Sequence, residues 1–179
     1  MTALDDPTRL TLTLPVTIRE ACQEDIPRLE WYGQYKHFRN LLRRAYKEQR
    51  AGRRLLLVAD LNGFPIGQLF VQLIASNRRI ADGHTRAYLY SFRVMELFQG
   101  QGIGTLLLST AEQRLARLGY HHAMIAVAKD NPRAQRLYER RGYTLIGEDP
   151  GRWRYVDHKG VTREVNEPCW ILEKLLESG

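Results

Sequence analysis

Apolar residues recur along the chain with two different periods, and these periods predict where strands and helices lie. In residues 87–94, every second residue from Tyr88 belongs to one set, Tyr88, Tyr90, Phe92 and Val94. This alternation in an aromatic-rich run predicts a strand with those four side chains on one face. In residues 107–118, leucine and alanine recur at helical spacing between polar residues, and Gly119 follows where a left-handed C-cap is expected. A strand and then a helix are therefore expected here.

The same alternation of elements continues after Gly119. Residues 123–128 form a short apolar run typical of a buried strand. Asn131 then provides a good N-cap, Pro132 a preferred first helical residue, and Gly142 a stop. A strand, a crossover helix and a second strand normally form a right-handed parallel pair.

The rest of the chain predicts a meander before this unit and further strands after it. An Asn62-Gly63 pair between two apolar runs is the strongest short signal for a β-hairpin. Residues 152–165 read as a protruding hairpin, either a lip of a binding site or a dimer contact. The remaining expected elements are a first strand at 11–19 that begins or is interrupted at Pro15, a short helix at 26–29, a basic helix from Phe38, and strands at 55–60, 65–74, 143–148 and 168–175.

A glycine-rich turn joins the strand at 87–94 to the helix that follows it. Its sequence is Gln99-Gly100-Gln101-Gly102-Ile103-Gly104-Thr105. Such a turn brings free backbone amides and the positive end of a helix together, which favours an anion, above all a phosphate. The spacing does not fit a dinucleotide fingerprint, and the turn lacks the lysine of a P-loop.

Composition indicates one domain. The chain has 179 residues, 44% of them hydrophobic, which suits a single core; we expect a flexible tail at 1–10 and one domain at 11–179. No apolar run approaches the roughly 20 residues of a membrane span, and the N-terminus does not resemble a signal peptide, so a cytoplasmic protein is expected. Two distant cysteines and five histidines without ligand spacing predict neither a disulfide nor a metal site.

The net charge of +7 is concentrated on the basic helix and the residues just after it, Arg39 to Arg54. A solvated helix face is the simplest account, and a surface for an acidic partner is the other. No nucleic-acid motif accompanies the charge, so we do not expect a nucleic-acid partner.

Three motifs together resemble the GNAT superfamily of N-acetyltransferases. They are Phe92-Arg93-Val94, the turn with Gln99, Gly102 and Gly104 in a Q-x-x-G-x-G pattern, and a later run in which Asn131, Ala134, Leu137-Tyr138 and Gly142-Tyr143 match the family's order. The resemblance implies an α/β (α+β) fold: a mixed, mostly antiparallel sheet of about seven strands, flanked by about four helices, with a parallel pair around the cofactor site.

The resemblance also implies that acetyl-coenzyme A is the co-substrate, without a metal. In the family, amides of residues 99–105 hold the pyrophosphate, and the strand end at Phe92 and Val94 binds the pantetheine arm, with Asn131 beside it. Residues of the next helix, Arg133, Ala134 and Tyr138, complete the implied coenzyme site. The family often has proline in place of Glu96 and tyrosine or tryptophan in place of Phe98, and these differences leave the amides unchanged.

Acetyl transfer by direct attack in a ternary complex needs several groups. The resemblance assigns the oxyanion donor to the backbone at Val94 and the general acid to Tyr138, while Glu96 is a weak candidate for the general base. The acceptor is expected to be a small-molecule or peptide amine, and the protein a monomer or homodimer. The alternative is a non-catalytic coenzyme A-binding or regulatory module whose basic face binds an acidic partner.

Overall fold

The computed structural model describes residues 12–177, in which seven strands form one sheet and two more form a separate hairpin. The predicted tail at 1–10 lies outside the described residues. The large sheet has the strand order β1-β2-β3-β4-β5-β9-β6, mostly antiparallel, with β4 and β5 parallel, and the smaller one pairs β7 with β8. The strands are β1 (Val16–Glu20), β2 (Arg54–Leu61), β3 (Phe64–Gln72), β4 (Arg86–Val94), β5 (His122–Ala128), β6 (Thr144–Asp149), β7 (Arg152–Val156), β8 (Thr162–Asn166) and β9 (Cys169–Leu175).

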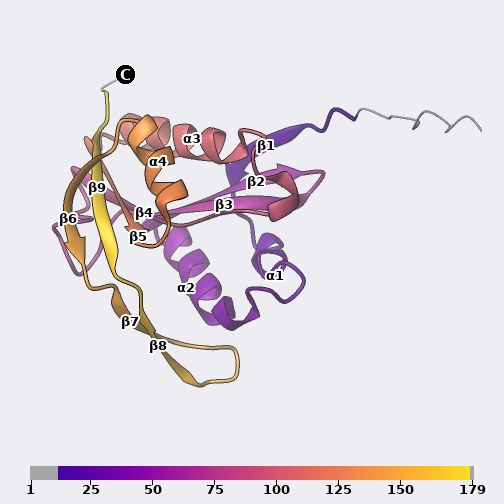
Figure 1. Cartoon of the computed structure of the whole chain (residues 1–179). Helices are drawn as coiled ribbons and strands as arrows, with labels where there is room; N and C mark the ends of the chain where they lie inside the picture. The colour runs from indigo at the N-terminus through magenta and orange to yellow at the C-terminus, as the bar shows by residue number, and fades with distance from the viewer. Residues whose placement is uncertain (1–11, 178–179) are drawn as a thin grey trace, which may run out of the picture.

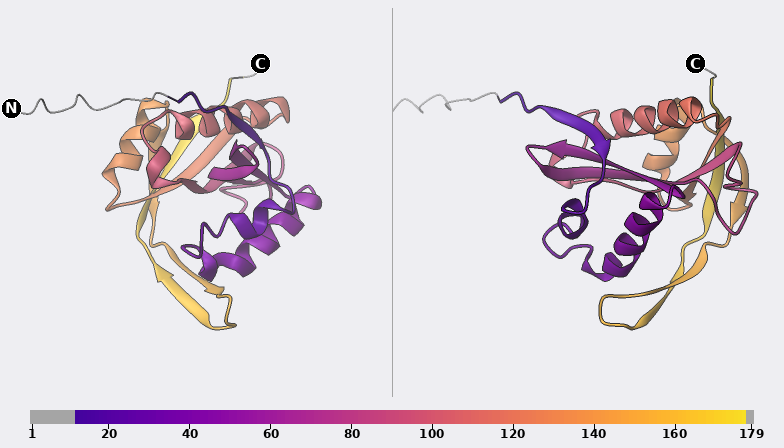
Figure 2. Two further views of the ribbon diagram at one scale, coloured as in Figure 1. Left: turned by 90° about the vertical axis from the view of Figure 1, so that its right-hand side faces the viewer. Right: turned by 180° about the vertical axis from the view of Figure 1, so that it is seen from behind.

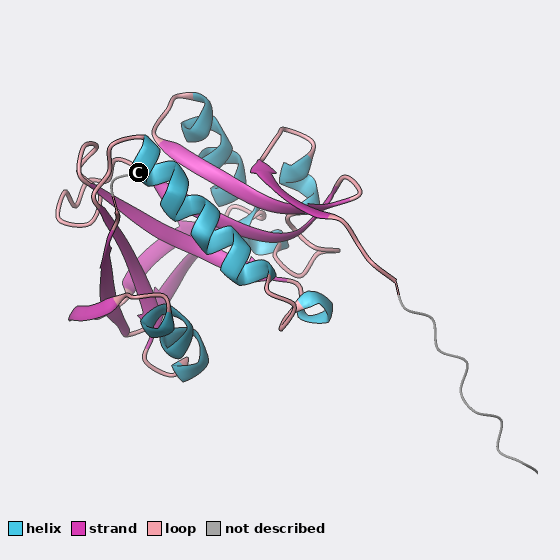
Figure 3. Cartoon of the chain, turned by 90° about the horizontal axis from the view of Figure 1, so that it is seen from above, coloured by secondary structure: helices cyan, strands magenta, loops and turns pink. Residues whose placement is uncertain are grey.

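The helices cover both faces of this sheet. In Figures 1 and 2, α3 and α4 lie on one face, and α1 and α2 lie on the other. Figure 3 looks onto the face with α3, which runs across the strands. The predicted fold of about seven strands and four α-helices is therefore confirmed for residues 12–177. The helices are α1 (Asp25–Arg28), α2 (Arg39–Arg50), α3 (Ile103–Arg117) and α4 (Pro132–Arg140), with 3-10 turns η1 (Lys36–Phe38) and η2 (Glu96–Phe98).

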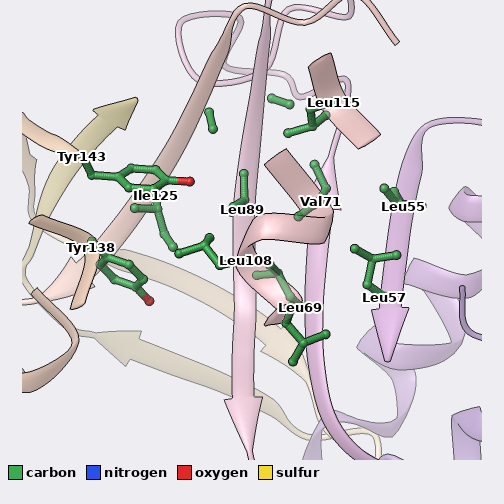
Figure 4. Packing of buried hydrophobic residues seen from close by; sticks show 14 of the residues in the cluster. Leu55, Leu57, Leu69, Val71, Leu89, Leu108, Leu115, Ile125, Tyr138 and Tyr143 are labelled. Carbon is green, nitrogen blue, oxygen red and sulfur yellow. The ribbon is translucent and has the colours of Figure 1, made fainter. Parts of the chain in front are cut away.

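Two hydrophobic clusters, one on each face, hold the layers together. Leu55, Leu57 and Ala59 of β2 pack in the cluster of α3, whereas Leu56 and Val58 pack in the cluster of α1 and α2. Because successive strand residues point to opposite faces, a strand buried on both sides has to be apolar throughout. Figure 4 shows the larger cluster, with Leu108 and Leu115 of α3 above the strands.

Local signals placed the turns well. The β2–β3 hairpin turns at Asn62 and Gly63, whose φ angles of 51° and 82° are the left-handed pair of a type I′ turn, as predicted.

The first strand was expected from residue 11, but β1 begins at Val16. Val16 pairs with Leu61, the last residue of β2, so no strand partner exists for earlier residues, and Pro15 has no N–H to donate.

The hairpin β7–β8 protrudes from the sheet as predicted, and it curls toward α2 rather than away from the domain (Figures 1 and 2). The Asn40 side-chain amide of α2 donates to the backbone oxygen of Asp157 at 2.7 Å. The rings of Phe38 and Tyr155 have their centroids 5.1 Å apart. The hairpin therefore forms a wall facing α2.

The basic helix is partly neutralised within the chain. Leu42 and Ala45 bury its apolar face, as predicted. Arg39 pairs with Glu30, and the arginines at 44 and 54 both pair with Glu48. In residues 12–177, Arg43, Lys47 and Arg50 form no ion pair, so a smaller positive face remains exposed.

Removing the Tyr143 hydroxyl should destabilise the protein without touching any reacting group. Tyr143 is buried and donates to Glu112 at 3.1 Å, and Glu112 also pairs with Lys174 at 2.7 Å. Because a hydrogen bond to a charged group contributes roughly 1.5–3 kcal/mol, Tyr143→Phe should lower the free energy of unfolding by about 1.5 kcal/mol. Urea denaturation measures this as a lower midpoint at unchanged slope. An unchanged midpoint would show that this hydrogen bond contributes nothing.

Candidate functional site

The sheet opens between β4 and β5. Their parallel pairing covers only Arg86–Leu89 against His122–Ile125, although the strands continue to Val94 and Ala128. The other edge of β5 is paired with β9 along its whole length. Residues 90–94 and 126–128 therefore face each other without pairing, and we call this gap the β4–β5 opening.

A β-bulge at Ser91 changes which side chains of β4 face which side. The register with β3 shifts between Gln68 and Phe70, and Ser91 has a φ of +52°. Gln68 holds the bulge by donating to the Ser91 hydroxyl at 2.6 Å and to its carbonyl at 3.0 Å. The expectation that Tyr88 and Tyr90 share a face with Phe92 and Val94 is therefore wrong, because one extra residue reverses the alternation.

After the bulge, the two tyrosines and Arg93 face the α2 side of the sheet, while Phe92 and Val94 pack in the cluster of α3. The end of β4 thus presents apolar side chains toward α3 and α4. Sequence analysis missed the bulge because Ser91 carries no glycine or proline signal.

The glycine-rich turn leads into α3, whose N-terminus has no side-chain cap within residues 12–177. Gly102 is the N-cap of α3 with a φ of +85°, and no side chain of the described residues caps this helix. The first helical bond runs from the Leu106 N–H to the Gly102 carbonyl at 3.0 Å. The N–H groups of residues 103–105 therefore lack an acceptor within the helix, and the positive end of its dipole lies at the same point. This arrangement fits a phosphate.

The glycines of the turn have different physical roles. Gly100 and Gly102 have positive φ angles, and a Cβ at either would meet no atom within 4 Å. A Cβ at Gly104 would lie 3.3 Å from the ring of Phe92, so Gly104 allows α3 to pack against β4. Only the first two therefore leave open space beside the amides.

The backbone at Val94 points into the β4–β5 opening. Met95 donates its N–H to Ile66 of β3 at 2.8 Å. Because paired groups alternate along an antiparallel strand, the N–H and C=O of Val94 point away from β3, toward β5. The Val94 carbonyl accepts from the Gln99 side chain at 2.9 Å, which ties the turn to the strand end.

Helix α4 lies beside the opening, and its N-terminus is capped. The Asn131 side-chain oxygen accepts from the Ala134 N–H at 3.1 Å, as its predicted N-cap role requires. This bond leaves the Asn131 side-chain amide group as the part of that residue free to bind a ligand. Arg133 and Arg136 are exposed on α4, whereas Lys129 is engaged by Glu148.

The hydroxyls of two neighbouring tyrosines have different environments. The Tyr143 hydroxyl is held by Glu112, so it is a satisfied core group. Tyr138 is also buried, with its ring 6.2 Å from that of Phe92, but its hydroxyl makes no hydrogen bond to the residues at 12–177. Burial, and next the nearby Tyr88, raise the pKa of the Tyr138 hydroxyl well above its ordinary value. Tyr138 therefore offers a protonated, uncommitted donor.

A cavity of about 850 Å³ lies on the other face of the sheet, between α2, β4, β5 and the hairpin β7–β8. Tyr88 and Tyr90 line it, which decides that they are wall residues rather than core. Burial, and then the nearby Cys169 and Asp149, raise the pKa of Tyr88 to about 12. The carboxylates that line the cavity are Glu148, Asp149 and Glu167.

Trp31, Tyr32 and Glu96 do not line the cavity. Trp31 is buried and donates to the Pro65 carbonyl at 2.9 Å, and Tyr32 is stacked on Phe64, so these two pack locally instead of lining the cavity. Glu96 is exposed in η2 and is not part of the cavity wall. His122 is the first residue of β5 and lies at the far end of that strand from Ala128.

Arg93 and Glu167 are wall residues that sequence analysis did not single out. An arginine in an otherwise aromatic and apolar strand was the available signal for Arg93. Nothing in the sequence around Glu167 indicated its place. In the part of the chain that the structure describes, no three His, Cys, Asp or Glu side chains gather as a metal site, and no helix is long and apolar enough to cross a membrane.

Comparisons with known proteins agree with this geometry. The model of the acetyltransferase (GNAT) family matches residues 19–143. In Bacillus subtilis (strain 168), the uncharacterized N-acetyltransferase YdgE is 36% identical over 59 residues, which are 33% of this chain and 38% of that protein. A spermine/spermidine N(1)-acetyltransferase of the same organism is 32% identical over 90 residues, which are 50% of this chain and 56% of that protein. The chain thus spans about half, or less, of the length of these curated relatives.

A solved structure shares the fold over almost the whole chain. The N-acetyltransferase from Staphylococcus aureus Mu50 superposes with a TM-score of 0.70 at 16% identity, covering 91% of this chain and 99% of that one. At this identity the likeness concerns the fold alone. The family model matches well over half of the chain, in the stretch that holds the turn, the opening and α4. The chain therefore belongs to the GNAT family of acetyltransferases.

Proposed function

We propose that the protein is an N-acetyltransferase that moves an acetyl group from acetyl-coenzyme A to a primary amine. The observation that carries the proposal is the uncapped N-terminus of α3, which lies next to the β4–β5 opening. On one face of the sheet this opening adjoins Tyr138, and on the other face a cavity large enough for a small acceptor. A thioester lying in the opening would be reachable from both faces.

The residues present fit the coenzyme. Amides of the turn at 100–105 would hold the diphosphate, because the Gln99 N–H already donates to the Glu96 carbonyl at 3.1 Å. Arg133 and Arg136 would be partners for further phosphate charge. The backbone of Phe92 and Val94, which is not paired with β5, would bind the pantetheine arm, and Asn131 and Ala134 would flank it. These roles rest on free amides, open glycines and an unpaired strand edge.

Acetyl-coenzyme A, when bound, supplies a thioester whose acetyl group forms an amide with the attacking amine in a ternary complex and whose sulfur leaves as a thiol. The Val94 N–H would stabilise the negative charge that develops on the acetyl oxygen. Tyr138 would give its proton to the departing sulfur. The acceptor ammonium has a pKa of about 10.4 when it is a lysine-like amine, so it must lose a proton first.

A base for that proton is proposed from the cavity wall. Glu96 was the candidate from sequence, but it is exposed outside the cavity. Glu148 is engaged by Lys129, and Asp149 accepts from the Gly151 N–H at 2.7 Å. Glu167 is also exposed, but it lines the cavity and has no ion pair within residues 12–177, so it is the wall carboxylate that is free to accept the proton directly or through water.

The proposal is tested by combining a binding measurement with an activity measurement. Acetyl-coenzyme A should raise the melting temperature, and a panel of primary amines should release free thiol beyond the rate without amine. Stabilisation without thiol release for any amine would favour the alternative, a coenzyme-binding module whose exposed Arg43, Lys47 and Arg50 dock an acidic partner. The absence of stabilisation would contradict both.

We do not assign to this chain the acceptor that a relative is named for. The Bacillus subtilis relative is named for spermine and spermidine, which are polycations, but the cavity of this chain is lined by both signs of charge, including arginines. A cytoplasmic location and a monomeric or homodimeric state stay predictions.

A further inference from the structure

Arg93 is a half-buried arginine in the cavity wall. It follows the Ser91 bulge on β4 and lies over two rings, with its central carbon 4.4 Å from the centroid of Tyr35 and 5.1 Å from that of Phe38. Burial lowers the pKa of this guanidinium, with the neighbouring Tyr35 and Glu167 acting in the opposite direction. Arginine nevertheless keeps its charge in proteins.

This cation lacks an anionic partner within residues 12–177. Among the described residues, the one side-chain hydrogen bond of Arg93 runs to the Ser91 hydroxyl at 3.3 Å. By contrast, Arg54, which lines the same cavity, pairs with Glu48 at 2.5 Å and also contacts the Tyr90 hydroxyl. Glu167 influences Arg93 electrostatically but forms no ion pair with it. Arg93 is therefore a largely covered positive charge with most of its donors unused.

The surroundings of Arg93 favour its charge. The rings of Tyr35 and Phe38 lie against the guanidinium and stabilise it by cation–π attraction. Its N–H donors form a planar fork that matches a planar, bidentate anion such as a carboxylate. A buried charge without such a partner is costly, and a ligand anion would remove that cost.

We propose that Arg93 binds the carboxylate of the acceptor, and that the acceptor is a small amino acid-type molecule carrying a carboxylate beside its reacting amine. The inference rests on the proposed acetyltransferase function and names the substrate class of the same cavity. Glu167 and Arg93 both line the cavity and form no ion pair with each other, which complements an ammonium and a carboxylate in one molecule. A volume of about 850 Å³ suits a small molecule of this kind.

The test compares acceptors that differ only in the carboxylate. The twenty amino acids and their C-terminal amides are offered to the wild-type protein with acetyl-coenzyme A, and kcat/KM is measured for each pair. Because a charged hydrogen-bonded pair contributes roughly 1.5–3 kcal/mol, the best amino acid should exceed its amide by between about 10- and 100-fold. Equal values across all pairs in the wild type would overturn the proposal.

Two variants and one control separate Arg93 from general electrostatics. Arg93→Gln should bring the ratio of acid to amide close to one, mainly through the acceptor KM, and Arg93→Lys should give an intermediate ratio because it keeps the charge without the fork. Arg117→Gln removes the same charge from the exposed end of α3 and should keep the wild-type ratio. A wild-type ratio retained in Arg93→Gln would contradict the assignment.

Calorimetric titration distinguishes this inference from the proposed function. Amino acids and their amides are titrated into the wild-type protein saturated with coenzyme A, where no turnover occurs. Tighter binding of the acids supports carboxylate binding by Arg93 even if no thiol release is found. In that case only the proposed enzymatic function fails. If the protein acetylates and binds amides and acids equally well, the proposed acetyltransferase function stands and the proposed carboxylate site is contradicted. Should Arg93→Gln fail to fold, the acid-to-amide ratios of the wild type and of Arg93→Lys still test the proposal.

Discussion

Tyr138→Phe is expected to lower kcat by at least about 100-fold while the KM for acetyl-coenzyme A stays nearly unchanged. A positioned proton donor contributes roughly 10²- to 10⁴-fold, and the hydroxyl of Tyr138 makes no hydrogen bond to the described residues that would tie it to packing. The ring, which packs near Phe92, is kept by phenylalanine. Steady-state kinetics with a saturating amine measures both constants.

Tyr143→Phe is the matched control for this variant. It removes a hydroxyl from the neighbouring tyrosine, whose ring centroid lies 5.9 Å from that of Tyr138. Since the Tyr143 hydroxyl is held by Glu112, this control should lose stability but keep kcat. If both variants keep wild-type turnover, Tyr138 is a packing residue and another group protonates the sulfur.

The pH profile adds an independent check on the same residue. Burial raises the pKa of Tyr138, so its hydroxyl stays protonated through neutral pH and beyond the ordinary tyrosine value of about 10. Loss of activity between pH 7 and 9 in the wild type therefore has to come from another group. On the acidic side of the pH–rate profile, activity should rise with pH as the acceptor amine loses its proton. This rise should persist in Tyr138→Phe.

The turns and helix ends could be predicted because they depend on neighbours in the sequence. Asn62-Gly63 sets its hairpin through two left-handed residues, and Asn131 caps α4 through a residue three positions away. Such contacts are encoded by spacing alone. The uncapped N-terminus of α3 was predicted in the same way, since Gly102 lies at its N-cap.

The cavity on the α2 face of the sheet could not be predicted, because it is assembled from distant segments. The bulge at Ser91 depends on Gln68 of the neighbouring strand, and it alone decides that Arg93 faces the cavity. The wall that faces α2 comes from a hairpin more than 100 residues later, held by the bond from Asn40 to Asp157. Strict alternation along β4, read from sequence, gave the wrong face for the residues after the bulge.

Thr105→Glu should weaken binding of acetyl-coenzyme A by at least about 100-fold without weakening the fold. Thr105 is exposed in the first turn of α3, where the free amides lie. Two unit charges about 5 Å apart interact by about 3 kcal/mol at an effective dielectric of 20, so a carboxylate there would repel the diphosphate strongly. The same carboxylate interacts favourably with the helix dipole, which contributes roughly 0.3–1 kcal/mol to stability.

Because Thr105→Glu should weaken coenzyme binding without destabilising the helix, it tests the coenzyme site more clearly than a substitution of a glycine. Any side chain at Gly102 would be strained by its φ of +85°, so lost binding there could reflect a damaged turn. Gln113→Glu, exposed farther along α3, adds the same charge away from the turn and should bind acetyl-coenzyme A normally. Calorimetry and thermal melting measure the two effects separately. Wild-type affinity in Thr105→Glu would mean that the diphosphate does not lie at this helix end, and the proposed coenzyme site would have to be abandoned.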